Sequence, residues 1–271
     1  MTSIARNGTA YDLHGPKDAP VIALIHGMGL CRHLWRDHLP AFAENYRVLN
    51  YDLYGHGQSA PSPQTASMTV YSEQLLELMD ELEIERAAIV GFSIGGMINR
   101  RFALDHGDRL SALAILNSPH ERGDEAQKLV EERAAKVASE GAMATMDAAL
   151  ERWFTPEFRE KDPASLALVR EWREITDRTT YPDACMALAK GVIELIRPEI
   201  PVTAPTLVIT CEHDSGSTPA MSHAIASEIE GAQTHIIPEL QHLGLMEKPE
   251  LFTGPVLKFL DRTVLNSAKG K

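Results

Sequence analysis

Apolar residues in the first part of the chain follow two alternating patterns. Short runs, most of them continuously apolar, predict strands buried on both faces of a parallel sheet, at residues 21–25, 47–51, 87–90 and 113–116. Apolar residues at helical spacing predict helices over residues 32–44, 69–83 and 97–106. Strand and helix therefore take turns along the chain, which indicates an α/β fold with a parallel sheet.

The two ends of the chain extend the same sheet. Asn7-Gly8 lies between two short extended segments, and because Asn-Gly favours a type I′ turn we expect an antiparallel hairpin over residues 3–13. Towards the other end, the pattern predicts strands over 206–210 and 234–237 and helices over 219–229 and 249–260. We expect residues 267–271 to be a frayed tail.

The alternation stops in the middle of the chain. The pattern there predicts helices without an intervening strand, over residues 124–140, 143–154, 163–177 and 182–195. Pro198, Pro201 and Pro205 end this stretch, and a strand follows. We therefore expect an all-helical cap over residues 120–196, inserted into a core made of residues 1–119 and 197–271.

A glycine-rich turn joins one predicted strand to the next helix, with Ser93 at its centre in Gly91-Phe92-Ser93-Ile94-Gly95-Gly96. The Gly-x-Ser-x-Gly spacing suits a sharp, strained turn that lifts the serine hydroxyl above the sheet edge. Side chains at Gly91 and Gly95 would collide with the neighbouring strand and helix. The first N–H groups of the helix would face negative charge that develops beside the serine oxygen.

Composition narrows the class of protein. The formal net charge of −12 over 271 residues argues against nucleic acid or an anionic membrane as a partner. The three cysteines are widely spaced, and no apolar signal segment or stretch of about 20 apolar residues is visible. We therefore expect a cytoplasmic protein that acts on a small molecule. No metal-ligand or dinucleotide motif is found, so we expect no metal and no cofactor.

Three residue types that nucleophilic catalysis requires each follow a predicted strand: Ser93, Asp214 and His242. The carboxyl ends of parallel strands share one edge of the sheet, where sites form. A serine hydroxyl needs a base, neutral imidazole can take its proton near pH 7, and a carboxylate holds the imidazole in the right tautomer. Glu212 competes with Asp214 for the acid role, and Asn117, after the preceding strand, carries no charge.

These residues and motifs resemble the α/β-hydrolase superfamily over nearly the whole chain outside the cap. The resemblance rests on His26-Gly27, Asp52-x-x-Gly55-His56-Gly57-x-Ser59, the serine turn, His213-Asp214 and His242-x-x-x-x-Glu247-x-Pro249. It implies a mostly parallel eight-stranded sheet with helices on both faces, and a serine hydrolase with Ser93, Asp214 and His242 as its triad. It also implies an oxyanion hole made by the backbone N–H groups of Met28 and Ile94.

Within that superfamily the chain is similar to 3-oxoadipate enol-lactonases. The similar stretches run from Ile25 through Trp35 and include Trp153-Phe154-Thr155-Pro156 in the cap. The resemblance implies cleavage of a small ester or lactone that carries a carboxylate, with a basic residue facing the pocket. The candidates for binding the substrate are Trp35, Arg152, Trp153, Arg170, Arg173 and Arg178. Core packing is an equally good account of Trp35.

Other activities on this fold stay open. Carbon–carbon hydrolases of meta-cleavage products commonly have tryptophan after the histidine, where this chain has Leu243. Cofactor-free perhydrolases and simple carboxylesterases share Gly-Phe-Ser-x-Gly-Gly. A non-catalytic receptor for a small molecule is the alternative of another class, because fold alone does not determine function.

Overall fold

A single eight-stranded sheet forms the centre of the protein, whose computed structural model describes residues 2–265. Its order is β1-β2-β4-β3-β5-β6-β7-β8, and all pairs from β4 to β8 are parallel. The pairs β1/β2 and β2/β4 are antiparallel. The strands are β1 (Ser3–Ile4), β2 (Ala10–His14), β3 (Val21–Ile25), β4 (Arg47–Tyr51), β5 (Ala87–Phe92), β6 (Leu110–Leu116), β7 (Thr206–Cys211) and β8 (Gln233–Ile237). The predicted eight-stranded, mostly parallel sheet is confirmed.

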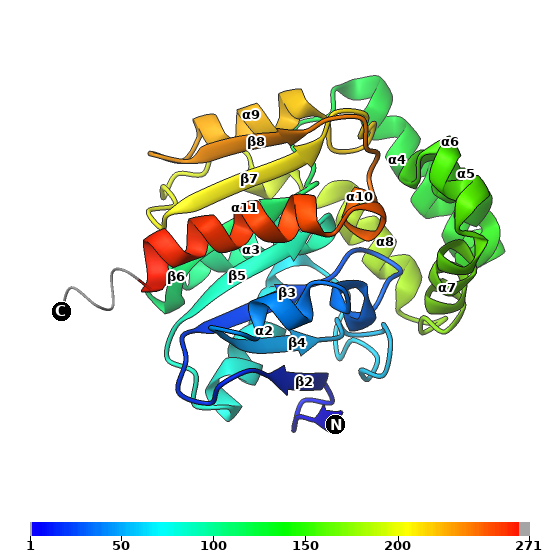
Figure 1. Ribbon diagram of the computed structural model, residues 1–271. Coiled ribbons are helices and arrows are strands. Elements are labelled where there is room, and N and C mark those ends of the chain that lie inside the picture. The colour runs from blue at the N-terminus through cyan, green and yellow to red at the C-terminus, as the bar shows by residue number, and fades with distance from the viewer. Residues whose placement is uncertain (1, 266–271) are drawn as a thin grey trace.

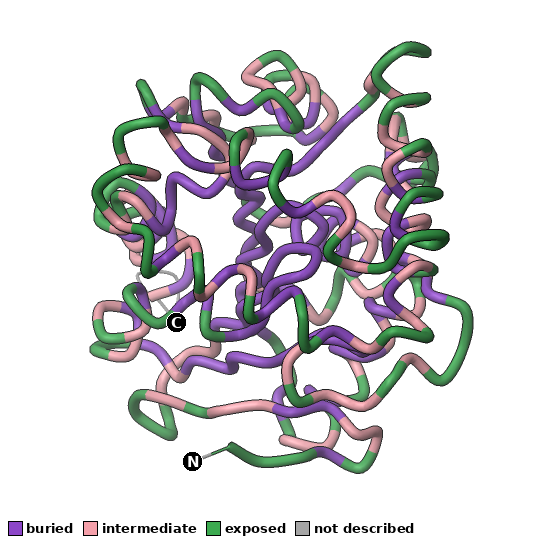
Figure 2. Tube along the Cα trace, turned by 90° about the vertical axis from the view of Figure 1, so that its right-hand side faces the viewer, coloured by how far each residue is buried: buried purple, intermediate pink, exposed green. Residues whose placement is uncertain are grey.

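Helices cover both faces of this sheet (Figure 1). One face packs against α2 (Met68–Glu81), α3 (Ile94–Asp105) and α9 (Pro219–Ser227), and the other against α1 (Leu39–Phe42) and α11 (Glu250–Leu260). Successive residues of β3 point to opposite faces of the sheet and belong to different hydrophobic clusters. Ala23 shares its cluster with residues of α2, and Leu24 shares its cluster with residues of α11. This explains why the strands have continuous apolar runs. Figure 2 shows the resulting buried centre inside an exposed shell.

The middle of the chain is helical throughout its described length. It contains α4 (Asp124–Glu140), α5 (Met146–Trp153), α6 (Pro156–Lys161), α7 (Pro163–Glu174) and α8 (Tyr181–Lys190), with short 3-10 turns at Ala142–Thr145 and Ile193–Leu195. In Figure 1 these helices gather on one side of the sheet. None of the described helices in the protein is both long and apolar enough to cross a membrane.

Several predicted boundaries were wrong. The helix expected over 32–44 is broken into a 3-10 turn, Arg32–Trp35, and α1, because Pro40 cannot continue a helix from the preceding turn. The helices expected over 143–154 and 163–177 are shorter, and α6 was missed. Side-chain caps mark the starts of α6 and α7. The Thr155 side chain accepts a hydrogen bond from Phe158 N, and the Asp162 side chain accepts one from Ser165 N.

The N-terminal hairpin forms, but with a different turn. Only Gly8 has a positive φ, of 83°, whereas a type I′ turn needs two such residues. Gly8 N donates to Ala5 O, and Ala5 N donates to Thr9 O, each at 2.9 Å, which makes a longer loop. The tail expected at 267–271 lies outside the described residues. Two short elements were not predicted: α10 (Gly244–Glu247) and a π-helical turn, Asp261–Leu265.

Candidate active site

Ser93 occupies the strained turn between β5 and α3. Its φ of 58° and ψ of −114° lie in a region that non-glycine residues rarely adopt. A Cβ at Gly91 would lie 2.1 Å from Gly95 O, and a Cβ at Gly95 would lie 2.5 Å from Ile25 O. The two glycines therefore allow helix, turn and strand to approach each other, as their spacing predicts.

His242 joins Ser93 to Asp214. Its Nε2 lies 3.1 Å from Ser93 Oγ, and its Nδ1 lies 2.6 Å from Asp214 Oδ2. An ionised carboxylate only accepts hydrogen bonds, so the Nδ1–H donates to Asp214 and leaves Nε2 free to accept from the serine hydroxyl. The three residues come from separate parts of the sequence and meet beyond the carboxyl ends of β5 and β7 and after β8.

Asp214 supplies the carboxylate that contacts His242, and both of its oxygens accept hydrogen bonds. Its Oδ1 accepts from the N–H groups of Gly216 and Ser217, each at 2.9 Å, while Asn117 Nδ2 donates to Oδ2 at 2.8 Å. Burial alone would raise the pKa of Asp214, but His242 and these donors lower it below its ordinary value. Glu212 is exposed and accepts instead from Glu239 N, away from the histidine.

Aromatic rings and contacts with two helices of the middle of the chain position the histidine. The ring of His242 lies 5.0 Å from the ring centroid of Phe92 and 6.1 Å from that of Trp153. Leu243 N donates to Trp153 O at 2.8 Å. Thr155 donates to Glu247 through its backbone N–H at 2.8 Å and its hydroxyl at 2.7 Å. These hydrogen bonds connect the segment after His242 to the end of α5 and the start of α6.

A pocket opens over these three residues, between the sheet edge and the helices α4, α5, α7 and α8. Ser93, Asp214 and His242 line it from the sheet side, together with Gly27, Met28, Leu30 and Phe92. Trp153, Arg173, Tyr181 and Cys185 line it from the helical side. A small molecule in this pocket would contact both the hydroxyl of Ser93 and the helical wall.

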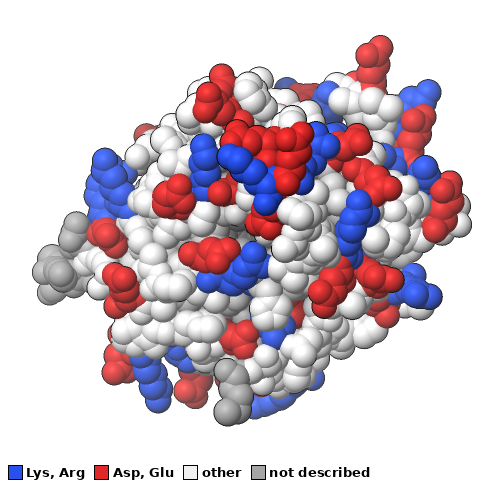
Figure 3. Space-filling model, turned by 45° about the vertical axis from the view of Figure 1, so that its right-hand side comes forward, with Lys and Arg blue, Asp and Glu red and all other residues white. Residues whose placement is uncertain are grey.

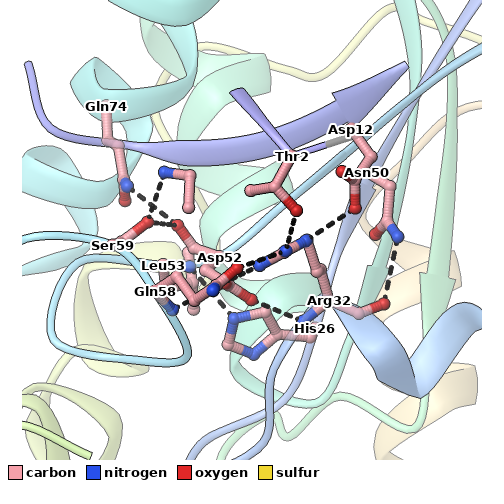
Figure 4. A network of polar contacts seen from close by, with 11 residues as sticks. Thr2, Asp12, His26, Arg32, Asn50, Asp52, Leu53, Gln58, Ser59 and Gln74 are labelled. Carbon is pink, nitrogen blue, oxygen red and sulfur yellow. Dashed lines mark hydrogen bonds and ion pairs between the residues drawn. The ribbon is translucent and has the colours of Figure 1, made fainter. Parts of the chain in front are cut away.

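The loop that carries Met28 is held by a buried polar network (Figure 4). Arg32 donates from its backbone N–H to Asp52 Oδ1 at 2.7 Å, and its guanidinium also contacts Asp52. His26 Nε2 accepts from Leu53 N at 3.0 Å, so its Nδ1–H donates to Gly27 O at 2.8 Å. The hydrogen bonds of the described residues include none from the N–H groups of Met28 or Ile94.

The predicted substrate-binding residues divide between pocket, core and surface. Arg152, Trp153 and Arg173 line the pocket. Trp35 does not: its indole is fully buried in the core beside His38, so core packing accounts for it. The side chain of Arg170 is 42% exposed and pairs with Asp147 at 2.5 Å. Arg178 is exposed and lines a separate pocket with residues of α4 and the 3-10 turn Ala142–Thr145.

Sequence reasoning did not identify much of the pocket lining, including Arg122, Arg133 and Tyr181. Arg122 and Arg133 belong to the polar side of the region around α4, and nothing in an amphipathic pattern separates an arginine facing a pocket from one facing solvent. Tyr181 is the first residue of α8, and its ring is buried. Only the folding of α4 and α8 against the sheet edge brings these side chains together.

Comparisons with known proteins agree with this architecture. The family model described as alpha/beta hydrolase fold matches residues 20–249. The crystal structure of the enol-lactonase from Burkholderia xenovorans LB400 is 34% identical, with a TM-score of 0.86, and the match covers 94% of this chain and 97% of that one.

Two curated proteins from Acinetobacter baylyi are also similar. "3-oxoadipate enol-lactonase 1" is 28% identical, covering 90% of this chain and 89% of its own. "(E)-2-((N-methylformamido)methylene)succinate hydrolase" is 25% identical, covering 96% of this chain and 97% of its own. With its sheet, its serine turn and these matches, this chain belongs to the alpha/beta hydrolase fold family.

Proposed function

We propose that this protein hydrolyses a small carboxylic ester or enol-lactone through an acyl-enzyme on Ser93. The observation that carries the proposal is the hydrogen-bonded path from Ser93 through His242 to Asp214 at the base of the pocket. Such a path lets imidazole remove the serine proton while the carboxylate stabilises the imidazolium. The relatives named as enol-lactonases support the lactone as substrate.

The first half of the cycle forms the acyl-enzyme. Ser93 Oγ attacks the carbonyl carbon, and its proton passes to His242 Nε2. The backbone N–H groups of Met28 and Ile94 hold the oxyanion, each contributing roughly 10²–10³ in rate. When the carbon–oxygen bond breaks, His242 gives the proton to the leaving alkoxide or enolate oxygen. In a lactone this opens the ring and leaves the product attached to Ser93.

Water completes the second half. His242 takes a proton from water, the hydroxide attacks the acyl carbon, and Ser93 Oγ leaves with the proton returned by His242. The Asp214 carboxylate stays ionised throughout, because the four hydrogen bonds around it favour the charged form. The helical wall over the pocket shapes the space that the acyl group occupies.

Turnover of a small panel tests this function. It contains p-nitrophenyl acetate, a longer p-nitrophenyl ester, a muconolactone-derived enol-lactone and a meta-cleavage dienoate, each with wild type and Ser93→Ala. We expect cleavage of the enol-lactone above the esters and no cleavage by the variant. Faster cleavage of the dienoate would make the protein a carbon–carbon hydrolase, and no Ser93-dependent turnover would favour a receptor.

The acid is tested by a matched pair of variants. Asp214→Asn should lower kcat by about 10⁴-fold, because the imidazole loses the tautomer that accepts from serine. Glu212→Gln, two positions away and exposed, should leave kcat within twofold of wild type. If the two results were reversed, Glu212 would be the functional acid.

A further inference from the structure

Arg173 is a buried cation with few partners. Arg173 is 4% exposed, and its guanidinium has one hydrogen bond to the described residues, from Nη1 to Ala142 O, which is long at 3.5 Å. Its Nε has no acceptor although it is buried. The guanidinium carbon lies 5.4 Å from the ring centroid of Trp153 and 5.3 Å from that of Tyr181. The two rings fix the guanidinium while leaving its donors free.

Arg173 also adjoins the reacting end of the pocket. A Cβ built at Gly29 would lie 1.9 Å from Arg173 Nε and 2.6 Å from Tyr181 Oη, so the side chain rests on the loop that carries Met28. The hydroxyl of Tyr181 is also buried, with the thiol of Cys185 as a polar neighbour and no oxygen or nitrogen partner among the described residues. The ring of Trp153 contacts both the guanidinium of Arg173 and the ring of His242. A group bound at Arg173 would therefore lie near the catalytic histidine.

Three more arginines line the helical side of the pocket and form a cationic patch apart from Arg173: Arg122, Arg133 and Arg152. Arg152 donates from Nη1 to Ala148 O, and Arg122 is held by Gln127 and two carbonyl groups. Arg133 has neither a hydrogen bond nor an ion pair among the described residues. Burial and neighbouring arginine charges lower the pKa of Arg152 and bring that of Arg122 to about 10.

Within residues 2–265, none of these four arginines forms an ion pair with a carboxylate, although Glu151 lies near enough to Arg152 to favour its charge. Asp214 is the only acidic residue in the described lining of the pocket, and its oxygens are already occupied by His242 and three other donors. The exterior differs, since Figure 3 shows acidic and basic side chains mixed over the face that it presents. A protein of net charge −12 therefore encloses a pocket of the opposite charge. Buried like charges without counter-ions are unfavourable, so the pocket favours anionic ligands.

We propose that the substrate carries two anionic groups, both carboxylates, one bound by Arg173 with Tyr181 and the other by the patch of Arg122, Arg133 and Arg152. This inference rests on the proposed function and extends it. One carboxylate at Arg173 would leave the second patch uncompensated. Guanidinium groups match carboxylates in a planar, two-point geometry, and the free donors of Arg173 and Arg133 are available for it.

Three esters with one leaving group test the number of charges. They are the p-nitrophenyl monoesters of butanoic, glutaric and propane-1,2,3-tricarboxylic acid, which carry no, one and two free carboxylates. Each carboxylate should raise kcat/KM by roughly tenfold, as expected for a charge-assisted hydrogen bond. Raising the salt concentration should weaken both increases.

Variants assign each increase to its residues. Arg173→Met should remove the increase from the first carboxylate, and Arg133→Gln should remove the increase from the second. The matched control is Arg170→Gln, a cap arginine that is exposed and paired with Asp147, which should behave as wild type towards all three esters. Equal kcat/KM for the esters with one and two carboxylates in the wild-type protein would overturn the proposal.

A binding experiment separates this proposal from the proposed function. Calorimetry with Ser93→Ala needs no turnover and uses monoamides, which keep the same number of free carboxylates as the esters. The monoamide of propane-1,2,3-tricarboxylic acid, with two free carboxylates, should bind about tenfold more tightly than the monoamide of glutaric acid, with one. Arg133→Gln in the same background should abolish that difference. Inorganic phosphate that bound as tightly as the amide with two carboxylates would overturn the two-carboxylate assignment. If no ester were cleaved while this binding pattern held, the function would fail and the anion sites would stand.

Discussion

Arg32 and Arg173 are equally buried, at 2% and 4% exposure, but their surroundings are opposite. The guanidinium of Arg32 donates to Asp52 and, at 2.7 Å each, to Asp12, Thr2 and Gln58. Arg173 has two aromatic rings, one long bond to a carbonyl and a free Nε. Arg32 therefore stabilises the fold through its hydrogen bonds, whereas Arg173 keeps donors that a ligand could use.

The physical difference lies in where each charge is compensated. The protein itself neutralises Arg32: burial opposes its charged form, but Asp52 and Asp12 more than restore it and raise its pKa. No acidic group in the described part of the chain does this for Arg173. A buried charge without a partner lowers stability, so the fold retains it at a cost that a bound anion would offset.

Removing the charge at Arg32 should have the largest effect. Arg32→Met leaves Asp52 fully buried without its cation, so the free energy of unfolding should fall by about 3–5 kcal/mol in urea titrations. Arg32→Lys keeps one charge and should lose less. Arg36→Met, exposed and paired only with the adjacent Asp37, is the control and should stay within about 0.5 kcal/mol of wild type. An Arg32→Met protein as stable as wild type would show that Arg32 does not stabilise the fold.

Acid should destabilise the native state through three buried histidines. Burial, the main cause in each, lowers the pKa of His26 and His38 to about 4 and that of His56 to about 3. Between pH 6.5 and 4 the unfolded chain therefore binds protons that the native state does not, and stability falls as pH falls. Each histidine contributes up to about 1.4 kcal/mol per pH unit.

Urea unfolding at pH 7, 6 and 5 measures this slope. His38→Gln should make it shallower, whereas His235→Gln should leave it unchanged because His235 is exposed. A free energy of unfolding that stayed constant from pH 7 to pH 5 would show that the buried histidines accept protons in the native state.

Removing the charge at Arg173 should change the free energy of unfolding less than Arg32→Met or acidification does. Arg173→Met loses two cation–π contacts but also an uncompensated buried charge, so the free energy of unfolding should stay within about 1 kcal/mol of wild type. Its KM for an ester with one carboxylate should rise by roughly tenfold. A loss of stability as large as that of Arg32→Met would mean that Arg173 is a structural residue.

The smallest effect is expected at the surface. Arg170→Gln breaks an exposed ion pair with Asp147, and such pairs contribute about 0–1 kcal/mol. Thermal unfolding should show almost no change in Tm. A clear loss of stability would indicate that this ion pair contributes more than its exposure predicts.

The sequence determined the sheet and the position of the serine, because both follow from local patterns. Val21–Ile25 and Ala87–Phe92 are continuous apolar runs, and such runs require burial on two faces. The turn at Ser93 is specified by glycines that leave room for the adjacent backbone. The middle of the chain was correctly predicted to be helical. However, Pro156 and Pro163, each preceded by a capping residue, begin two separate helices where the apolar pattern predicted fewer breaks.

The tertiary structure alone decided which polar groups meet. Asp214 rather than Glu212 contacts His242, although the two acids are two residues apart, because the chain turns after β7 and points only one of them at the histidine. Arg173 faces the pocket and Arg170 faces solvent, although both lie on α7. Spacing along a helix specifies a face, but which face becomes the wall of a pocket depends on residues far away in the sequence.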